Sequence, residues 1–441
     1  MPLSRSDAHH LLRRLGLGAR PGEIAHFAGR ELPDVLDEMF ALTPGVPSPP
    51  AAVNRARWYD AKIGTSDWWM DRLAAARWLG PPGTPSPLIE KLALFWHSHF
   101  ACGTDKVREF RALWRQVEAY HRHGLGDFAV LTSAIMTDGG MLRYFDNVTN
   151  VDGRPQENLA RELMELHTIG VGNFSERDVT EMARAWTGFG VVVPFGADSV
   201  LTPRFRRGDH DAGPKQLFGL APRRWRGPDT IDELVHGVKQ RDAARFMATK
   251  LWRYYVDDAP NPADIEALAD VFIASGMRID ALLRAIVSHP TFWAPATRWG
   301  MVRQPLEWAS DLMARFDISA ADSNVTWLSR YMGQELFNPP NVNGWGTNAY
   351  WVSTTAVWGK ARFLKWIRNH DGSDAVFADL HRGSRDAAVE RILDRFGVED
   401  ATAATRATVG EWFDRITADQ PWAAPRDAFY IGGLLPEVQV A

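Results

Sequence analysis

The segment ENLARELMELHTIG, residues 157–170, indicates the fold class more directly than any other part of the sequence. Its residues are good helix formers, it contains no proline, and Gly170 follows its last apolar residue, as at the end of many helices. The same apolar spacing recurs through most of the chain and predicts an all-α protein. We expect helices over 5–15, 21–42 with a break near Gly29, 54–79, 86–99, 106–124, 126–137, 139–145, 157–170, 175–189, 229–256, 261–275, 278–288, 303–317 and 323–336.

One stretch interrupts the helical pattern. GVVVPF, which begins at Gly190, and SVLTPRF, which ends at Phe205, have a strand-like composition and predict a short β-hairpin insertion around 190–206. After a long loop at 338–353, two or three C-terminal helices are expected within 371–441. Because no internal repeat or linker-like stretch occurs, we expect residues 1–441 to form a single large helical domain.

Composition narrows the class of protein. The chain of 441 residues is 45% hydrophobic and 24% charged, as is typical of a soluble globular protein. Its net charge of −4 gives no support for a nucleic-acid partner. A single cysteine, Cys102, excludes an internal disulfide framework, and no apolar run is long enough to span a membrane. The first residues contain no apolar signal-peptide core, so we expect a cytoplasmic protein or one exported folded with a partner.

The acidic residues of segment 157–170 lie at an unusual place on the predicted helix. At 100° per residue, Asn158, Glu162 and Glu165 fall within about 60° of one another and beside the leucine stripe. A carboxylate pair beside a core needs a cation, a metal or a shared proton. Two interpretations stay open, a functional pair or a structural salt bridge to Arg143, Arg161 or Arg184.

Three further clusters are candidates for a site. LFWHSHF, residues 94–100, contains His97 and His99, which could share a metal only if the helix ends there; otherwise one is a core histidine and the other a helix-terminal one. The loop GDHDAGPKQLFG, 208–219, is either a ligand-binding loop or a solvated charged loop, and FNPPNVNGWGTNAYW, 337–351, is either the rim of a cleft or a rigid loop with buried tryptophans. The polar and aromatic residues of these two loops are Asp209, His210, Asp211, Lys215, Asn341, Asn343, Trp345 and Trp351.

Tryptophan is the one residue type in clear excess. The 19 tryptophans are roughly three times ordinary usage. Most are expected in the core, and the rest favour a cleft that stacks sugar rings or other flat ligands. With the acidic pair, this favours a hydrolase or related enzyme that acts on a glycan or glycoside. The alternatives are a metalloenzyme with a mixed His/Glu site and a non-catalytic partner or scaffold of another enzyme.

The candidate roles are assigned as follows. Catalytic residues are Glu162, Glu165, His210 and Asp211; substrate-binding residues are Asn158, Arg161, Lys215, Asn341, Asn343, Trp345 and Trp351; His97 and His99 are metal ligands. The expected cofactor, if one is bound, is a divalent metal such as Zn, Fe or Mn. The expected ligand is a carbohydrate or another small molecule.

Six motifs occur in order along the chain. They are LFWHSHFACGTDKV (94–107), MLRYFDNVTN (141–150), ENLARELMELHTIGVGNFSERDVTEMARAWTGF (157–189), HDAGPKQLFG (210–219), ARFMATKLWRYYV (244–256) and LFNPPNVNGWGTNAYWVSTTAVWGKARF (336–363). From about residue 7 to about residue 370, the chain closely resembles the large bacterial family named domain of unknown function 1800. The resemblance implies a partner protein from a sulfatase- or phosphatase-like family, beside which members are often encoded. The resemblance assigns no catalytic role to any residue of this chain.

Overall fold

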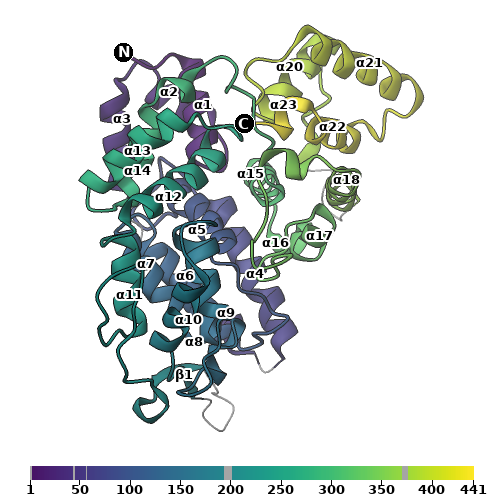
Figure 1. The fold of residues 1–441 in the computed structure, drawn as a ribbon. Helices are drawn as coiled ribbons and strands as arrows, with labels where there is room; N and C mark the ends of the chain where they lie inside the picture. Colours follow the sequence, from purple (N-terminus) through teal and green to yellow (C-terminus); the bar gives the residue numbers. More distant parts are fainter. Residues whose placement is uncertain (1, 43–44, 56, 193–200, 370–375) are drawn as a thin grey trace.

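Helices make up nearly all of the regular structure (Figure 1). The computed structural model describes residues 2–42, 45–55, 57–192, 201–369 and 376–441. The first helices are α1 Arg5–Leu15, α2 Pro21–Phe27, α3 Leu32–Ala41, α4 Trp58–Ala75, α5 Pro87–His99, α6 Phe110–His123, α7 Phe128–Met136, α8 Gly139–Tyr144, α9 Asn158–Glu162 and α10 Glu176–Ala185. The later ones are α11 Gly227–Val235, α12 Gln240–Tyr255, α13 Pro262–Ala274, α14 Ile279–Ser288, α15 Pro305–Phe316, α16 Ala320–Ser323, α17 Val325–Met332, α18 Thr354–Arg368, α20 Arg385–Arg395, α21 Ala403–Asp419, α22 Ala424–Gly433 and α23 Pro436–Gln439. The all-α prediction is confirmed.

The predicted hairpin is present. β1, Phe189–Val192, pairs antiparallel with β2, Thr202–Phe205, in a register that places Phe189 opposite Phe205. The part of the predicted insertion at 193–200 lies outside the described residues. The hairpin packs against α8 at one end of the molecule (Figure 1).

Two predictions about helix extent are wrong. The helix expected over 229–256 is divided into α11 and α12, because the chain turns at Gly237 and the Glu233 carboxylate accepts the Val238 N–H at 2.7 Å. Beyond the long loop, the described residues contain more helices than the two or three expected, since α18 and α20–α23 all follow it. Short helices joined by tight turns give a weaker periodic signal than long ones.

The core extends along the length of the molecule, with α5 at its centre. Twelve residues of α5 are buried, from Pro87 to His99. α1, α4 and α6 pack on α5, while α12 packs on α13 and α11. In Figure 1 the helices α15–α18 and α20–α23 form the right side of the molecule, where α18 packs on α17 and α22. No helix within the described ranges is long and apolar enough to cross a membrane, as predicted.

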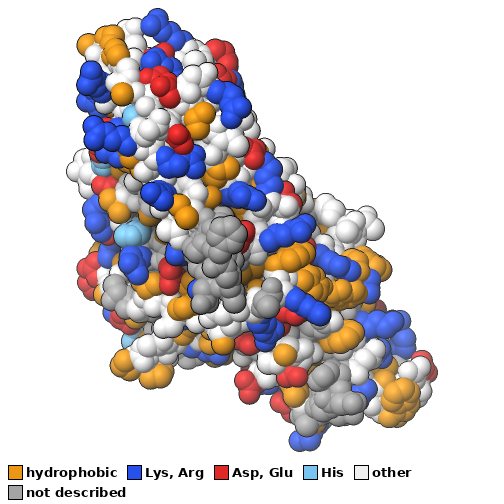
Figure 2. All heavy atoms as spheres, turned by 90° about the horizontal axis from the view of Figure 1, so that it is seen from below, with side chains coloured by type: hydrophobic (Ala, Val, Ile, Leu, Met, Phe, Trp, Pro, Cys, Tyr) orange, Lys and Arg blue, Asp and Glu red, His pale blue; other side chains and the backbone are white. Residues whose placement is uncertain are grey.

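Surface charge is mixed. Figure 2 shows the molecule from below, with basic and acidic side chains intermingled over much of this face. On the right of the view, hydrophobic side chains gather beside Lys and Arg side chains, on the side where α17 and α18 lie in Figure 1.

Candidate functional site

The segment 157–170 is not one regular α-helix. It begins as α9, and at Leu163 it widens into a π-helix, Leu163–Thr168. The Ile169 N–H donates to the Met164 carbonyl at 3.0 Å, five residues back, which is the backbone bond of this wider turn, and the Thr168 hydroxyl donates to the Leu163 carbonyl at 2.5 Å. The 100° spacing therefore applies strictly only as far as Glu162, although Glu165 remains close enough for its charge to act on the Glu162 carboxyl. Single π-turns inside helices occur often at functional sites.

Glu162 and Glu165 are half-buried and have no hydrogen bond or ion pair with any residue that the structure describes. Burial raises the pKa of Glu162, and the neighbouring Glu165 carboxylate raises it further. No ion pair within the described residues joins either glutamate to Arg143, Arg161 or Arg184; Arg161 is bound to Glu176 and Arg184 to Asp211, although the Arg161 charge still lowers the pKa of Glu162. The two carboxylates are thus close together, and neither forms an ion pair with a described residue.

His99 and His167 connect the end of α5 to the π-helix. The His99 Nε2–H donates to the His167 carbonyl at 3.1 Å, and the His167 Nδ1–H donates to the His99 carbonyl at 2.9 Å. Because a carbonyl can only accept, these contacts assign the tautomers: His99 Nδ1 and His167 Nε2 carry lone pairs. Both atoms are buried and have no hydrogen-bond partner among the residues that the structure describes. Burial lowers the pKa of both rings, that of His167 to about 3, so both are neutral.

A cavity of about 160 Å³ opens beside His99. It lies between the end of α5, the C-terminal part of α12 and the loop after α17. Its wall includes three residues that the sequence marked as candidates, His99, Asn343 and Trp345, together with Lys250 and Arg253 from α12. This cavity, here called the Lys250 pocket, is the candidate functional site.

Lys250 supplies the pocket with a buried amine. Its ammonium group has no acidic partner within the described residues and lies 5.2 Å from the ring centre of Phe246. Burial, with a smaller contribution from the Arg253 charge, lowers its pKa to about 8. Arg253 itself is exposed and makes no described ion pair. The pocket therefore holds two uncompensated cations, one of which loses its proton close to neutral pH.

The loop that forms the other wall is anchored on α5. The Ser98 hydroxyl accepts the Trp345 N–H at 2.9 Å and lies 3.2 Å from the Trp345 carbonyl. Gly344 adopts φ +74°, and a Cβ there would lie 2.0 Å from the Ser98 carbonyl oxygen, so only glycine fits. This close approach holds Asn343 and Trp345 at the pocket.

The other residues of this loop have structural roles. The Asn341 side chain accepts the Asn343 N–H at 2.8 Å, which closes a turn. Trp351 is 2% exposed and does not line the pocket. His97 faces a different side of α5 from His99, since its Nε2 accepts the Phe337 N–H at 3.0 Å. Its ring packs 5.4 Å from that of Trp345, behind the pocket wall.

The loop 208–215 does not line the Lys250 pocket, and its candidate residues have partners of their own. His210 Nδ1–H donates to the Thr187 carbonyl at 2.9 Å, and Asp211 pairs with Arg184 at 2.6 Å. The Lys215 ammonium is buried and donates to the carbonyl oxygens of Asp211 and Trp225. These contacts tie the loop to α10, as in a structural rather than a ligand-binding loop.

The remaining candidates lie on the outside of α9. Asn158 is exposed and 3.5 Å from Asp146, while Arg161 joins Glu157 and Glu176. Within the described ranges, no group of three His, Cys, Asp or Glu side chains is placed to hold a metal ion. His97 and His99 therefore do not form part of such a group there, and the zinc, iron or manganese cofactor stays a prediction.

Lys250 and Arg253 are the residues that the sequence interpretation missed. They lie in the motif ARFMATKLWRYYV, where the apolar neighbours Met247, Leu251 and Tyr254 predict a buried helix. A lysine within so apolar a helix was the available signal, because a buried amine needs a partner or a function.

Comparison with other proteins gives one match. No curated protein and no solved structure matches the chain. The family described as "Protein of unknown function (DUF1800)" matches residues 10–439, so its extent reaches well past residue 370, where the quoted motifs end, and includes the C-terminal helices. Because this match covers nearly the whole chain, the protein belongs to the DUF1800 family.

Proposed function

We propose that the protein is an enzyme that binds a small anionic substrate in the Lys250 pocket and transfers a proton there. The observation that carries this proposal is the presence of two cations without acidic partners, Lys250 and Arg253, in one cavity beside a neutral imidazole. A cavity of about 160 Å³ is smaller than the roughly 300–1,000 Å³ of most ligand sites, so it takes one small molecule or one end of a larger one.

Each lining residue has a part in this chemistry. The Arg253 guanidinium is free to bind a carboxylate or phosphate in a bidentate manner. The Asn343 amide and the Trp345 ring supply a polar and a flat contact from the opposite wall. Lys250, with a pKa of about 8, is present in both protonation states near neutral pH, which suits a general acid or base.

These features support proton abstraction from a carbon next to a carboxylate or carbonyl group. The positive charge of Arg253 stabilises the negative charge that develops on the substrate oxygen, and the neutral Lys250 amine accepts the proton. The unpartnered His99 Nδ1 is a second acceptor at the same wall, although its lowered pKa makes it the weaker base.

The test measures exchange of a substrate proton for deuterium, which requires no assumption about the product. The protein is incubated in D₂O with hexuronates, small 2-hydroxy carboxylates and sugar phosphates, and proton NMR follows loss of the signal next to the anionic group. We expect exchange with at least one probe, its loss in Lys250→Met and weaker binding in Arg253→Gln. Arg245→Gln, which changes an exposed cation of the same helix, is the matched control and should behave as wild type. The proposal would be contradicted if none of the anionic probes raised the melting temperature and none underwent exchange.

A glycan or glycoside hydrolase that uses Glu162 and Glu165 is the second candidate. It is supported by the absence of described partners for the two carboxylates and by the raised pKa of Glu162, which suits a proton donor beside an ionised acid. Neither carboxylate lines the Lys250 pocket, so the two candidates are separable by mutation. A role as partner or scaffold for a sulfatase- or phosphatase-like protein stays a prediction.

A further inference from the structure

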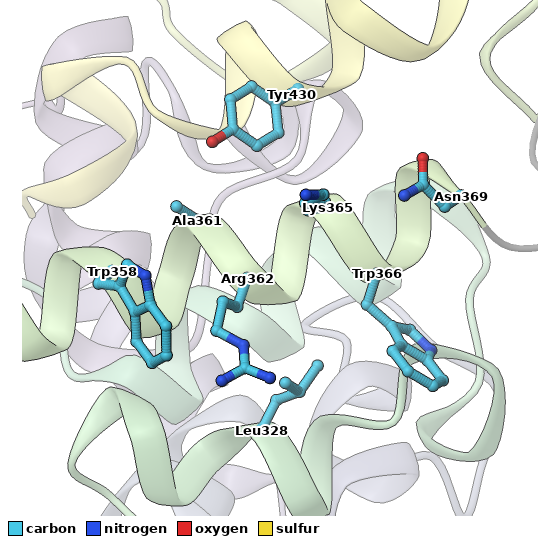
Figure 3. Close-up of a pocket in the computed structure, with 8 residues that line it drawn as sticks. All are labelled: Leu328, Trp358, Ala361, Arg362, Lys365, Trp366, Asn369 and Tyr430. Carbon is cyan, nitrogen blue, oxygen red and sulfur yellow. The ribbon is translucent and has the colours of Figure 1, made fainter.

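A second cavity, distinct from the Lys250 pocket, lies among the C-terminal helices. It has a volume of about 730 Å³ and runs along α18, between α17 and α22 (Figure 3). Its lining residues from α18 form two rows with helical spacing. Trp358, Arg362 and Trp366 form the row beside Leu328 of α17, and Ala361, Lys365 and Asn369 form the row beside Tyr430 of α22. This cavity is called the α18 groove.

Two indole rings are exposed at the two ends of the first row. Trp358 is 51% exposed and Trp366 is 46% exposed, although such large apolar rings are normally covered. The Trp366 ring is fixed in place, because its Nε1–H donates to the Asp322 carbonyl at 3.1 Å. Eight residues of helix separate the two tryptophans, a rise of about 12 Å. A single flat ligand is too short to contact both rings, whereas a chain of several rings can.

Arg362 lies between the two tryptophans and is held by aromatic rings alone. Its guanidinium carbon is 4.6 Å from the Trp358 ring centre and 4.5 Å from that of Tyr331. Neither Arg362 nor Lys365 has a hydrogen bond or ion pair with any residue in the described ranges. Stacking fixes the guanidinium but leaves its N–H groups free. The groove thus presents two positive charges that no described carboxylate neutralises.

We propose that the α18 groove binds an acidic oligosaccharide, one whose sugar rings carry carboxylate groups. The C–H face of a sugar ring packs on the negative face of an indole, so one chain can stack two of its rings, with at least one further ring between them, on Trp358 and Trp366. A ring carboxylate then pairs with Arg362 or Lys365. The Asn369 amide and the Tyr430 hydroxyl lie at the other edge of the groove and hydrogen-bond to sugar hydroxyls.

Two other occupants fit less well. A nucleic acid carries a phosphate on every nucleotide and needs a longer basic track, whereas two uncompensated cations line this groove and the whole chain has a net charge of −4. A peptide helix docks into an apolar groove through aliphatic anchors, whereas only two of the eight lining residues here, Leu328 and Ala361, are aliphatic; three are aromatic and three are charged or polar. This proposal rests on the groove alone and does not depend on the Lys250 pocket.

The experiment titrates the full chain with short oligogalacturonates by calorimetry. The comparison ligands are the carboxyl-reduced neutral oligomer, poly-glutamate and oligothymidylate. We expect binding of the oligogalacturonate, at least about fivefold weaker binding of the neutral oligomer, and binding that weakens with added salt. Stronger binding of poly-glutamate or oligothymidylate, or no binding of the oligogalacturonate, would overturn the proposal.

Variants locate the site. Trp358→Ala and Arg362→Gln should each weaken binding at least about fivefold, the expected loss of one aromatic or one charge-assisted contact. The matched controls are Trp422→Ala, which removes a tryptophan 78% exposed elsewhere, and Arg415→Gln, which removes an exposed arginine of α21; neither should change binding. If one of these groove variants fails to fold, Lys365→Gln takes its place in the binding test. The Lys365 side chain is exposed, so its replacement should not affect folding. Equal affinity in groove and control variants refutes the assignment.

Discussion

His99 and His167 each donate a ring N–H to the other's backbone carbonyl, at 3.1 and 2.9 Å. Both carbonyls belong to the last turns of their helices, where no further turn of the same helix supplies a donor. The two imidazoles therefore cap each other's helices and join α5 to the π-helix. The pair also places the His99 ring at the wall of the Lys250 pocket.

Replacing His167 with phenylalanine should destabilise the protein. The variant keeps a ring of similar size but removes the N–H that satisfies the His99 carbonyl. A buried acceptor left without a donor costs about 1–3 kcal/mol. Urea denaturation measures the change, and His123→Phe on α6 is the control at a less buried position. In a double-mutant cycle with His99→Phe, the two changes should be non-additive; simple additivity would show that the two bonds act independently.

Stability should also fall at mildly acidic pH because of this pair. The pKa of His167 is about 3 in the folded protein and about 6.5 in the unfolded chain, so the unfolded state binds more protons between these values. Its contribution is complete above about pH 6.5 and is lost as the pH falls towards 3. Between about pH 6 and 5, wild type should lose on the order of 1 kcal/mol more than His167→Phe. Parallel pH profiles of the two proteins would contradict this expectation.

The helical periodicity was sufficient to predict the fold class but not the shape of segment 157–170. Leu159, Leu163 and Leu166 have the spacing of an α-helix, and no residue type in ELMELHT marks a π-turn. The wider turn is associated with tertiary contacts, above all the bond from His167 to the His99 carbonyl 68 residues away. The spacing of apolar residues within one helix gives no information about a contact with a residue so distant in the sequence.

The candidate site was predicted in part. His99, Asn343 and Trp345 were marked as candidates and do meet at one cavity, because Gly344 brings the loop onto Ser98. Lys250 was missed, since its role follows from which helices surround α12 rather than from its neighbours in sequence. Conversely, His210 and Asp211 have the residue types of a site, but nearby partners such as Thr187 and Arg184 satisfy them.

The Lys250 amine should titrate near pH 8. Its pKa is lowered to about 8, so the reaction of its amine with an acylating reagent should reach half its maximum near that pH. Mass mapping of the modified peptide measures this, with exposed lysines as the reference. A midpoint near the ordinary value of about 10.4 would show that the amine is solvated. A hexuronate that occupies the pocket should slow the labelling.

Lys250→Met should raise stability while abolishing proton exchange with the substrate. The folded protein holds the charged amine at a cost, because the lowered pKa means that folding disfavours the proton. This cost is present below about pH 8 and disappears as the pH rises past the unfolded value of about 10.4. We expect a gain of about 1 kcal/mol at pH 7 in urea denaturation, and no gain at pH values above the unfolded pKa. A loss of stability at pH 7 would indicate that the amine has a structural partner.

Gly344→Ala should disrupt the pocket wall. The added Cβ would lie 2.0 Å from the Ser98 carbonyl oxygen at a φ of +74°, so the loop must move away from α5. The cost should be about 2–4 kcal/mol, as expected for a steric clash combined with backbone strain. Gly208→Ala is the control, since a Cβ there meets nothing within 4 Å. Thermal denaturation gives the stability change, and a variant as stable as Gly208→Ala would refute the close approach.

Glu162→Gln distinguishes a functional acid from a structural one. Burial and the Glu165 carboxylate raise the pKa of Glu162, so its charged form is disfavoured in the folded protein and the amide should melt at the same temperature or higher. The charge penalty is present above the raised folded pKa and is lost as the pH falls below the unfolded value.

Glu157→Gln is the control, because it breaks an ion pair with Arg161 and should cost no more than about 1 kcal/mol. Melts are run with and without a chelator. If the chelator destabilises wild type but not Glu162→Gln, a metal binds at this acid; if Glu162→Gln melts several degrees lower in both conditions, Glu162 is structural and the hydrolase candidate is wrong.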